Sequence, residues 1–277
     1  MVTCRAHPVL ALTLTPMIEF LNQYGFTLLA GFVGAALGSF LNVCVYRWPN
    51  DESVIRPRSR CPGCGTPVRW RDNLPVLGYF LLRGRCRACG VSLSLQYPLV
   101  EAMVALLWAG LAASMGPHPE VLRGGLFLTI LLGIALTDAR TYIIPDQFSL
   151  GGMLLGLALS PLPGGVDVVQ SLSGAALGFG LLWLVAVLGK LAFKKDAMGG
   201  GDVKMMAMVG AFLGPAGVVL TLFLGALVGS VIFGPISWKT KKLVPFGIFL
   251  GVGAVVSYGW GGALVEWYVG RVLGLAP

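Results

Sequence analysis

The chain has 277 residues, of which 56% are hydrophobic and only 12% are charged. A soluble domain carries roughly 25% charged residues, so this composition excludes an ordinary soluble globule, and a disordered chain would need low hydrophobicity and high charge. A polytopic membrane protein remains, with lipid as its main solvent. The formal net charge of +8 would also suit a nucleic-acid-binding protein, so the positions of the basic residues must decide between these classes.

Several apolar runs are long enough to cross the ~30 Å hydrocarbon core of a bilayer, which takes ~17–25 residues. They lie at about 24–46, 98–116, 121–138, 146–161, 168–190, 215–236 and 244–270. An eighth segment, 203–213, is too short to cross alone and ends at Gly214-Pro215, which predicts a half-length or tilted helix joined to the next span. The sequence therefore predicts an all-α polytopic membrane protein with about eight transmembrane helices.

Basic residues are concentrated between the first two spans, where loop 47–97 holds nine arginines. If this loop faces the cytoplasm and the chain crosses at each of eight spans, 17 of the 20 Lys and Arg residues lie on the cytoplasmic side. Only Arg5, Arg123 and Arg271 then lie outside. This asymmetry follows the positive-inside rule and supports both the orientation and the even number of spans. It favours the bilayer as the partner of the basic residues, and we expect no nucleic-acid partner.

Glycine pairs four residues apart recur within the spans, among them the duplicated GAALG at 34–38 and 174–178. Each such pair places two glycines on one helix face, which lets helix backbones approach closely in lipid. We interpret these pairs as helix-packing contacts that carry no chemistry.

Four of the six cysteines form two C-x2-C pairs in the basic loop, Cys61 with Cys64 and Cys86 with Cys89. Two such pairs can complete a tetrahedral zinc site, although twenty-one residues separate them, just beyond the usual ~15–20. The alternatives are two disulfides, which a reducing cytoplasm disfavours, a redox pair, which lacks the βαβ setting, and free thiols. We expect a structural zinc ion, because four thiolates leave no open position for water. Cys4 and Cys44 are interpreted as unpaired and inert.

Two of the twelve acidic residues lie at span boundaries on the predicted cytoplasmic side, Asp138 at the end of the third span and Asp202 at the start of 203–213. A carboxyl group near hydrocarbon is costly to ionise and marks a functional site by default. Two carboxylates held close cannot both ionise, so one can keep a proton while the other acts as a base on water. Gly199, Gly200 and Gly201 would let a peptide backbone approach Asp202.

Other interpretations of these acids remain open. Each aspartate could cap a helix or pair with Arg140 or Lys204, or the two could line an ion or proton pathway. Asp146 follows a proline and is predicted to be a helix N-cap. Glu101 and Glu266 receive no assignment. A histidine-based catalytic arrangement is not credible, because the only two histidines fall on the predicted outer side.

The sequence resembles the bacterial type IV prepilin peptidases, which are membrane aspartic proteases of the GxGD type. The resemblance covers about residues 25–255 in matching order. It rests on GSFLNVCVYRWP (38–49), the cysteine pairs, DNLPVLGYFLLRGRC (72–86), SLQYPLVE (94–101), TDARTYIIPD (137–146), MGGGDVKMMAMVGAFLG (198–214) and VPFGIFLGVGA (244–254).

The resemblance implies that Asp138 and Asp202 form the protease pair, with Gly199 to Asp202 filling the GxGD motif. It implies cleavage of prepilin or pseudopilin leader peptides, for type IV pili or type II secretion, at the cytoplasmic face of the inner membrane. It also implies that the new amino terminus is methylated with S-adenosylmethionine, an activity linked to the cysteine loop and to Gly84. Two departures are a short loop between Pro49 and Cys61, and Ala139-Arg140-Thr141 where many members place an acid or a histidine.

The sequence therefore predicts three parts. Residues 1–46 hold the first transmembrane helix, 47–97 form a zinc-stapled, methyltransferase-associated cytoplasmic loop, and 98–277 form the transmembrane peptidase domain. The alternatives are a proton-coupled transporter that uses the aspartates, and a non-catalytic scaffold whose zinc loop docks a partner.

Overall fold

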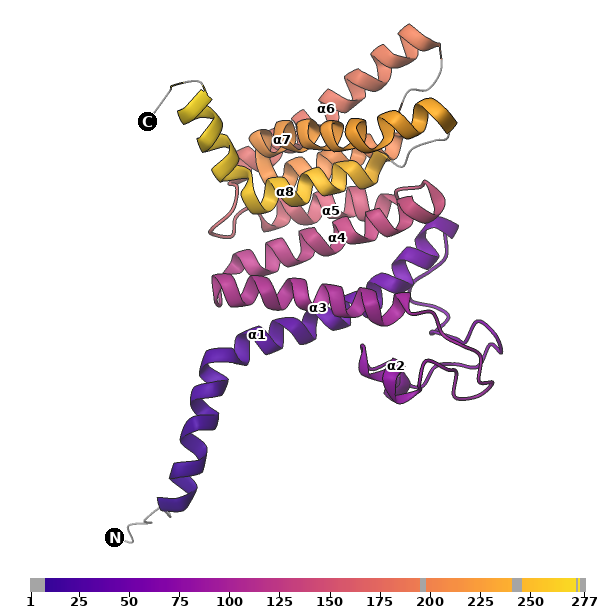
Figure 1. The fold of residues 1–277 in the computed structure, drawn as a ribbon, viewed down its shortest axis with the longest axis vertical. Helices are drawn as coiled ribbons and strands as arrows, with labels where there is room; N and C mark the ends of the chain where they lie inside the picture. Colours follow the sequence, from indigo (N-terminus) through magenta and orange to yellow (C-terminus); the bar gives the residue numbers. More distant parts are fainter. Residues whose placement is uncertain (1–7, 195–197, 241–245, 273, 275–277) are drawn as a thin grey trace. The chain divides into compact units, whose positions relative to one another are not determined.

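The computed structural model is built from helices, and it describes residues 8–194, 198–240, 246–272 and 274 (Figure 1). The main helices are α1 (Pro8–Arg47), α2 (Leu77–Leu81), α3 (Gln96–Met115), α4 (Pro119–Thr141), α5 (Asp146–Leu159), α6 (Val168–Phe193), α7 (Gly200–Thr240) and α8 (Phe246–Trp267). Short helical turns are η1 (Trp48–Asn50), η2 (Trp70–Asn73) and η3 (Tyr268–Val272). The described residues form no strand, only two isolated bridges in the cysteine loop. The predicted all-α class is confirmed.

Six helices of the described chain are long and apolar enough to cross a membrane, namely α1, α3, α4, α6, α7 and α8. Helix α5 has 14 residues, about 21 Å at 1.5 Å per residue, which is shorter than the hydrocarbon core. Helix α7 is interrupted at Gly214, whose φ of 69° and ψ of −176° are not helical. The predicted junction between 203–213 and the next span therefore lies at this glycine, while the total of eight spans stays a prediction.

The chain forms two compact units. Unit 1 comprises residues 1–40 and 59–121, and unit 2 comprises 41–58 and 122–277. In unit 1, α1 packs on α3 through the first GAALG: a Cβ on Gly34 would lie 2.7 Å from the Val104 carbonyl oxygen, and one on Gly38 would lie 2.8 Å from Glu101 Cα. The units thus group α3 with most of α1 and with the part of the loop that holds the cysteines. The boundaries at 46/47 and 97/98 were predicted from the sequence, and they stay a prediction.

In unit 2 the first half of α7 is held in a close-packed core. The second GAALG lies on α6, where a Cβ on Gly174 would collide with the Gly210 carbonyl and one on Gly178 with the Met206 carbonyl. Ser171 Oγ donates a hydrogen bond of 2.6 Å to the Ala211 carbonyl across the same contact. Helices α5 and α8 also pack on α7. Asp202, in the first turn of α7, is therefore attached to a rigid element.

Candidate functional site

Asp138 lies in the last turn of α4 and is buried, with 5% of its surface exposed. The backbone amides of Gly247 and Ile248, in the first turn of α8, interact with its carboxyl group. Its Oδ2 atom has no hydrogen-bond partner among the described residues. One carboxyl oxygen thus remains for a ligand or a water molecule.

Asp202 is the third residue of α7 and is partly exposed. Its backbone N–H donates to the Gly199 carbonyl at 3.2 Å, and the Gly199 amide in turn interacts with the Asp202 carboxylate. The second interaction is the half of a capping box in which the third helical residue reaches back to the N-cap amide; Gly199 has no side chain to supply the other half. Asp202 therefore does cap its helix, which is one of the alternatives left open from the sequence. Its carboxylate can still accept further hydrogen bonds.

The fold brings the two aspartates together although they are sixty-four positions apart. The charge of Asp138 acts on the Asp202 carboxyl group, so the two carboxyl groups lie within Coulombic range of each other. Both belong to unit 2. Two adjacent carboxyl groups share protons, so that one acts as an acid while the other acts as a base.

The glycines beside the aspartates have different surroundings. A Cβ on Gly199 would lie 3.4 Å from Asp202 Oδ2, and one on Gly200 would meet nothing within 4 Å. A Cβ on Gly201 would lie 2.9 Å from Ile144 Cβ. Gly199 and Gly200 thus have room around them beside Asp202, whereas Gly201 is required for helix packing.

Ile144 and Gly247 belong to the site but received no role from the sequence. A Cβ on Gly247 would lie 2.9 Å from both Asp138 Oδ2 and Ile144 Cδ1. Ile144 therefore contacts the glycine beside Asp202 on one side and the glycine beside Asp138 on the other. The motifs around both residues were recognised, but a periodic pattern does not reveal a contact between separate loops.

Asp146 is the first residue of α5, after the N-cap Pro145, so the predicted N-cap role is wrong by one position. Its carboxylate accepts hydrogen bonds from Lys204 Nζ at 2.7 and 2.9 Å. The two side chains are 55% and 36% exposed. Lys204, predicted as a possible partner of Asp202, thus pairs with Asp146 and ties α5 to α7.

Because solvent screens an exposed ion pair, which contributes about 0–1 kcal/mol, we expect Asp146→Asn to retain most of the wild-type activity. Thermal unfolding and the rate of substrate cleavage would measure this. Lys204→Met, which removes the other partner of the ion pair, should retain as much activity as Asp146→Asn. A loss of activity in Asp146→Asn as large as that in Asp138→Asn would make Asp146 part of the reacting site.

The four loop cysteines converge, with all their Sγ atoms within 4.8 Å of one another. The Sγ atoms of Cys61 and Cys89 are 3.7 Å apart, and a tetrahedral zinc ion with Zn–S distances of ~2.3 Å places its sulfurs about 3.8 Å apart. Each pair lies in the same kind of turn: Gly65 N–H donates to the Cys61 carbonyl, and Gly90 N–H to the Cys86 carbonyl, both at 2.9 Å. These glycines have φ of 70° and 72°, which suits glycine. The predicted cluster can hold a metal ion.

Local hydrogen bonds favour thiolates at two of the cysteines. The side chain and amide of Thr66 lower the pKa of Cys64 to about 6, and the amides of Cys89 and Ala88 lower the pKa of Cys86. Although the Val91 amide favours the Cys89 thiolate, desolvation and the neighbouring sulfurs raise the pKa of Cys89 to about 12. Four sulfurs this close can all ionise only with a cation between them.

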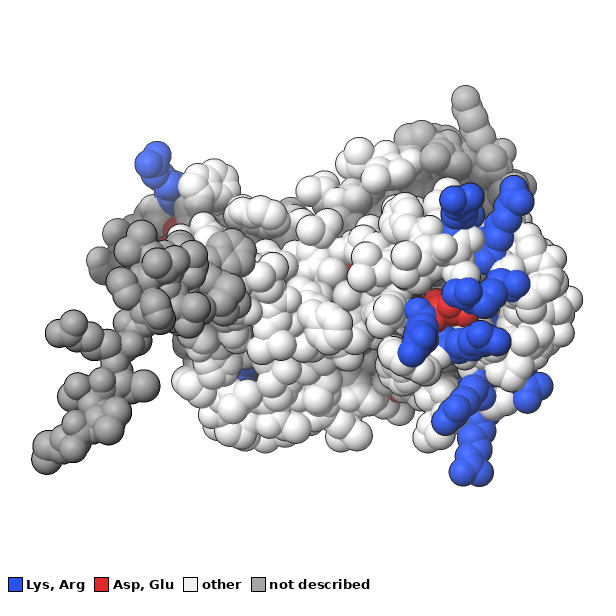
Figure 2. All heavy atoms as spheres, turned by 90° about the horizontal axis from the view of Figure 1, so that it is seen from below, with Lys and Arg blue, Asp and Glu red and all other residues white. Residues whose placement is uncertain are grey.

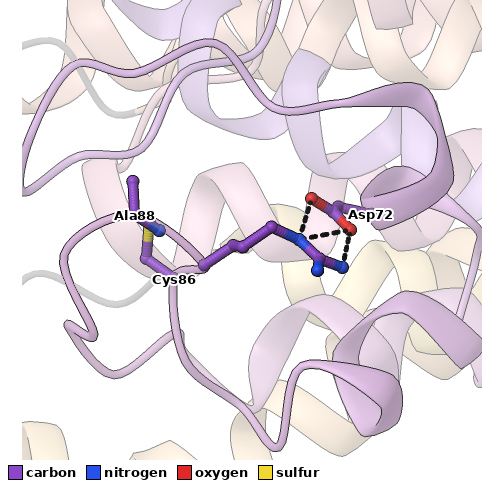
Figure 3. A network of polar contacts seen from close by, with 4 residues as sticks. Asp72, Cys86 and Ala88 are labelled. Atoms are coloured by element: carbon purple, nitrogen blue, oxygen red, sulfur yellow. Dashed lines mark hydrogen bonds and ion pairs between the residues drawn. The ribbon is translucent and has the colours of Figure 1, made fainter.

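An ion pair attaches the second cysteine turn to the helical part of the loop (Figure 3). The Arg87 guanidinium donates to the Asp72 carboxylate from Nη2 at 2.6 Å and from Nε at 3.0 Å. The hydrogen bond from Arg87 lowers the pKa of Asp72. Figure 3 also shows Ala88 beside Cys86, whose Sγ accepts a 3.4 Å hydrogen bond from the Ala88 amide. Asp72 lies in η2, so the ion pair joins η2 to the metal-ligand turn.

Gly84 is buried in this loop and has a φ of 67°. A Cβ here would lie 2.8 Å from the Tyr79 hydroxyl oxygen. Gly84 N–H donates to the Tyr79 carbonyl at 2.9 Å, and Leu93 N–H donates to the Gly84 carbonyl at 2.8 Å. Gly84 thus joins α2 to the segment before α3.

Glu101, unassigned from the sequence, is buried in α3 and anchors a strained turn. Its Oε2 accepts a 2.6 Å hydrogen bond from the Val76 amide. Val76 has a φ of 61°, and Leu77 N–H donates to the Pro75 carbonyl at 2.6 Å, which is a γ-turn with positive φ, a rare and strained conformation for a β-branched residue. Glu101 therefore stabilises the entry into α2.

Comparison with known proteins decides which family this arrangement represents. Residues 32–115 match the model of the bacterial peptidase A24 N-terminal domain, and residues 125–234 match that of the type IV leader peptidase family. The chain belongs to the type IV leader peptidase family. The resemblance found in the sequence is thereby confirmed, and no solved structure matches the chain.

Three relatives each carry the name prepilin leader peptidase/N-methyltransferase. The Aeromonas hydrophila protein is 33% identical over 265 residues, which cover 86% of this chain and 91% of the relative. The Neisseria gonorrhoeae protein is 35% identical over 73% of this chain and 79% of the relative. The Myxococcus xanthus protein is 38% identical over 72% of this chain, but the match covers only 60% of that longer protein.

Proposed function

We propose that this chain is a membrane aspartic endopeptidase that cleaves prepilin or pseudopilin leader peptides with Asp138 and Asp202. The observation that carries the proposal is that two aspartates from separate helices lie within Coulombic range of each other, with Ile144 packed against both Gly201 and Gly247 beside them. One carboxylate takes a proton from water, which attacks the scissile carbonyl. The other carboxyl, protonated, donates a hydrogen bond to the carbonyl oxygen, and a proton then passes to the leaving amine.

The open side of Gly199 and Gly200 supports this assignment, because an extended peptide backbone needs room beside the reacting carboxyl. The distribution of basic residues supports a site at the cytoplasmic face of the inner membrane. The chain is then a multi-pass protein whose substrate holds its apolar segment in the bilayer and its scissile bond at the surface.

We further propose amino-terminal methylation of the cleaved product, with S-adenosylmethionine as methyl donor. The double name of the relatives supports this activity. Gly84 and the four loop cysteines belong to unit 1, whereas both aspartates belong to unit 2. Separate units suit two activities that act in sequence on one substrate.

The metal in the cysteine cluster is proposed to be a structural zinc ion held by Cys61, Cys64, Cys86 and Cys89. When bound, it supplies charge neutralisation and a covalent cross-link for the loop. We expect about one zinc per purified chain. Cys61→Ser combined with Cys86→Ser should abolish metal binding and loosen loop 47–97 before the spans are disturbed, because a structural site contributes directly to folding.

Metal analysis and hydrogen exchange of the loop amides would check this prediction. Acidification should release the metal, because the ligands must be thiolates. Cys44→Ala is the control, since Cys44 is buried elsewhere and its loss should leave the metal content unchanged. A metal-free protein with intermolecular disulfides at these four positions would refute the structural zinc.

Co-reconstitution with candidate prepilins and pseudopilins, followed by mass spectrometry of the products, tests the proposed function. A peptidase yields a shortened substrate, and a methyltransferase adds the mass of one methyl group to its new amino terminus. A transporter or a scaffold would leave the substrate intact. The comparisons lend no support to either of those alternatives.

A further inference from the structure

We propose that the outer face of α2, together with the arginines around it, docks on anionic phospholipids at the surface of the bilayer that holds this chain. We call this surface the α2 patch and define it by Leu77, Phe80 and Leu81. The proposal requires only that the chain spans a membrane, and it is independent of the proposed chemistry.

Helix α2 has an inner face and an outer face. A Cβ on Gly78 would collide with the Asp72 carbonyl, so this side of α2 packs on η2. Leu77, Phe80 and Leu81 fall at i, i+3 and i+4, on one face of a helix. Their exposed fractions are 62%, 65% and 73%. Three large apolar side chains on one short helix mark an interaction site rather than a solvated surface.

The patch is surrounded by positive charge. Residues 59–97 contain six arginines and one acid, Asp72, which Arg87 already neutralises. Trp70, in the adjacent η2, is 73% exposed, and the Arg71 guanidinium lies 5.2 Å from its ring centroid. Arg83 and Arg85 follow α2 directly and are exposed. Figure 2 shows that Lys and Arg side chains gather at one end of the face in view, while most of the rest of that face is without charge.

This combination of chemistry fits a lipid surface. Exposed Trp, Phe and Leu among arginines are typical of segments that lie in the headgroup region of anionic membranes. The positive charge survives metal binding, because four thiolates with one Zn²⁺ carry only two negative charges. A second copy of the same patch would repel it, which disfavours a symmetric dimer through this surface.

The chain itself keeps the patch near the bilayer. Loop 47–97 connects α1 with α3, and both helices are candidate membrane spans. Both ends of the loop are thus anchored at the membrane, and contact with the surface costs little further loss of freedom. The γ-turn held by Glu101 begins immediately before Leu77, so the orientation of α2 is set by a span.

Photo-crosslinking of the full-length chain tests the proposal. Phe80 is replaced by p-benzoylphenylalanine, and the protein is reconstituted in nanodiscs of phosphatidylcholine with or without phosphatidylglycerol. Illumination should yield mainly lipid adducts, several-fold more of them when phosphatidylglycerol is present. When p-benzoylphenylalanine replaces Ala88 instead, at an exposed position of the second cysteine turn, few lipid adducts should form. The proposal would be overturned if the main adducts formed with added prepilin, with a second copy or with another part of the chain. It would also be overturned if position 80 yielded no more lipid adducts than position 88.

The charge contribution has a matched control. Arg83→Gln with Arg85→Gln should reduce the preference for phosphatidylglycerol by up to about fivefold per charge. Arg56→Gln with Arg58→Gln removes the same charge from the same loop, further from α2, and should have a much smaller effect. Equal effects of the two pairs would contradict a localised patch.

Hydrogen exchange of the wild-type chain provides a measurement that needs no substitution at the patch. Amides 77–83 should exchange more slowly in anionic than in neutral nanodiscs, and high salt should reduce this difference. Identical exchange in both lipids would overturn the proposal. Cleavage of a prepilin in the same nanodiscs reports separately on the proposed function, so either can fail without the other.

Discussion

Asp138→Asn and Asp202→Asn should each abolish leader-peptide cleavage in a protein that still inserts and folds. Asparagine preserves the volume of the side chain but cannot accept a proton from water or supply one to the leaving amine. General acid–base groups contribute up to about 10⁴-fold to rate, and residues that act as a unit are not additive. The double variant should therefore be no less active than either single variant. Mass spectrometry of a reconstituted prepilin would detect the missing product.

Asp167→Asn is a suitable control for these variants. Asp167 caps α6 by accepting a 2.8 Å hydrogen bond from the Gln170 amide, and asparagine serves equally well as an N-cap. This control should cleave at the wild-type rate. Normal cleavage by Asp138→Asn would show that the assignment of the pair is wrong.

Gly84→Glu should yield cleaved but unmethylated product. Its backbone is left-handed, and a Cβ would lie 2.8 Å from the Tyr79 hydroxyl oxygen, so glutamate must displace Tyr79 and the turn that follows α2. The expected effect is confined to unit 1, whereas both aspartates lie in unit 2. Methylation should fall below detection while the cleavage rate stays near that of the wild type. Cleavage should also proceed without S-adenosylmethionine.

Two further variants serve as controls for this experiment. Gly65→Ala has a similar left-handed φ of 70° but open space around its Cβ, so it controls for backbone strain and should still methylate. Asp202→Asn should leave full-length prepilin unmodified yet methylate a pre-cleaved pilin. If folded Gly84→Glu loses cleavage as completely as Asp202→Asn, the two activities are not separable in this chain.

Residue types and their spacing were sufficient to indicate the candidate groups for chemistry. Two C-x2-C pairs predicted a four-sulfur cluster, because short chelating turns are local and each turn needs its own glycine. The duplicated GAALG predicted close helix contacts, since two small residues on one helix face have few other uses in lipid. The apolar composition of the spans predicted a membrane protein. The positions of Asp138 and Asp202 at span ends indicated them as the candidate pair.

The surroundings of these side chains depend on contacts between segments that are distant in the sequence, and no local sequence pattern contains that information. The sequence allowed Lys204 to pair with Asp202, but the structure places its amine on Asp146. Asp202 was predicted either to cap a helix or to act chemically; the structure shows its interaction with the Gly199 amide, and the chemical role stays a prediction. The predicted span count and domain boundaries rest on the sequence alone, and both stay predictions.

The sequence by itself therefore determined the all-α membrane class and the cysteine cluster, and it indicated the two aspartates as candidates. Only the tertiary structure decided what surrounds them: Ile144 between Gly201 and Gly247, the α8 amides on Asp138, the hydrogen bond from Val76 to Glu101, and the exposed side of α2. The physical reason is the distance along the chain over which each effect acts. Hydropathy, chelate spacing and glycine preference act over a few neighbouring residues, whereas burial, carboxylate proximity and the faces of a short helix depend on segments that meet only after folding.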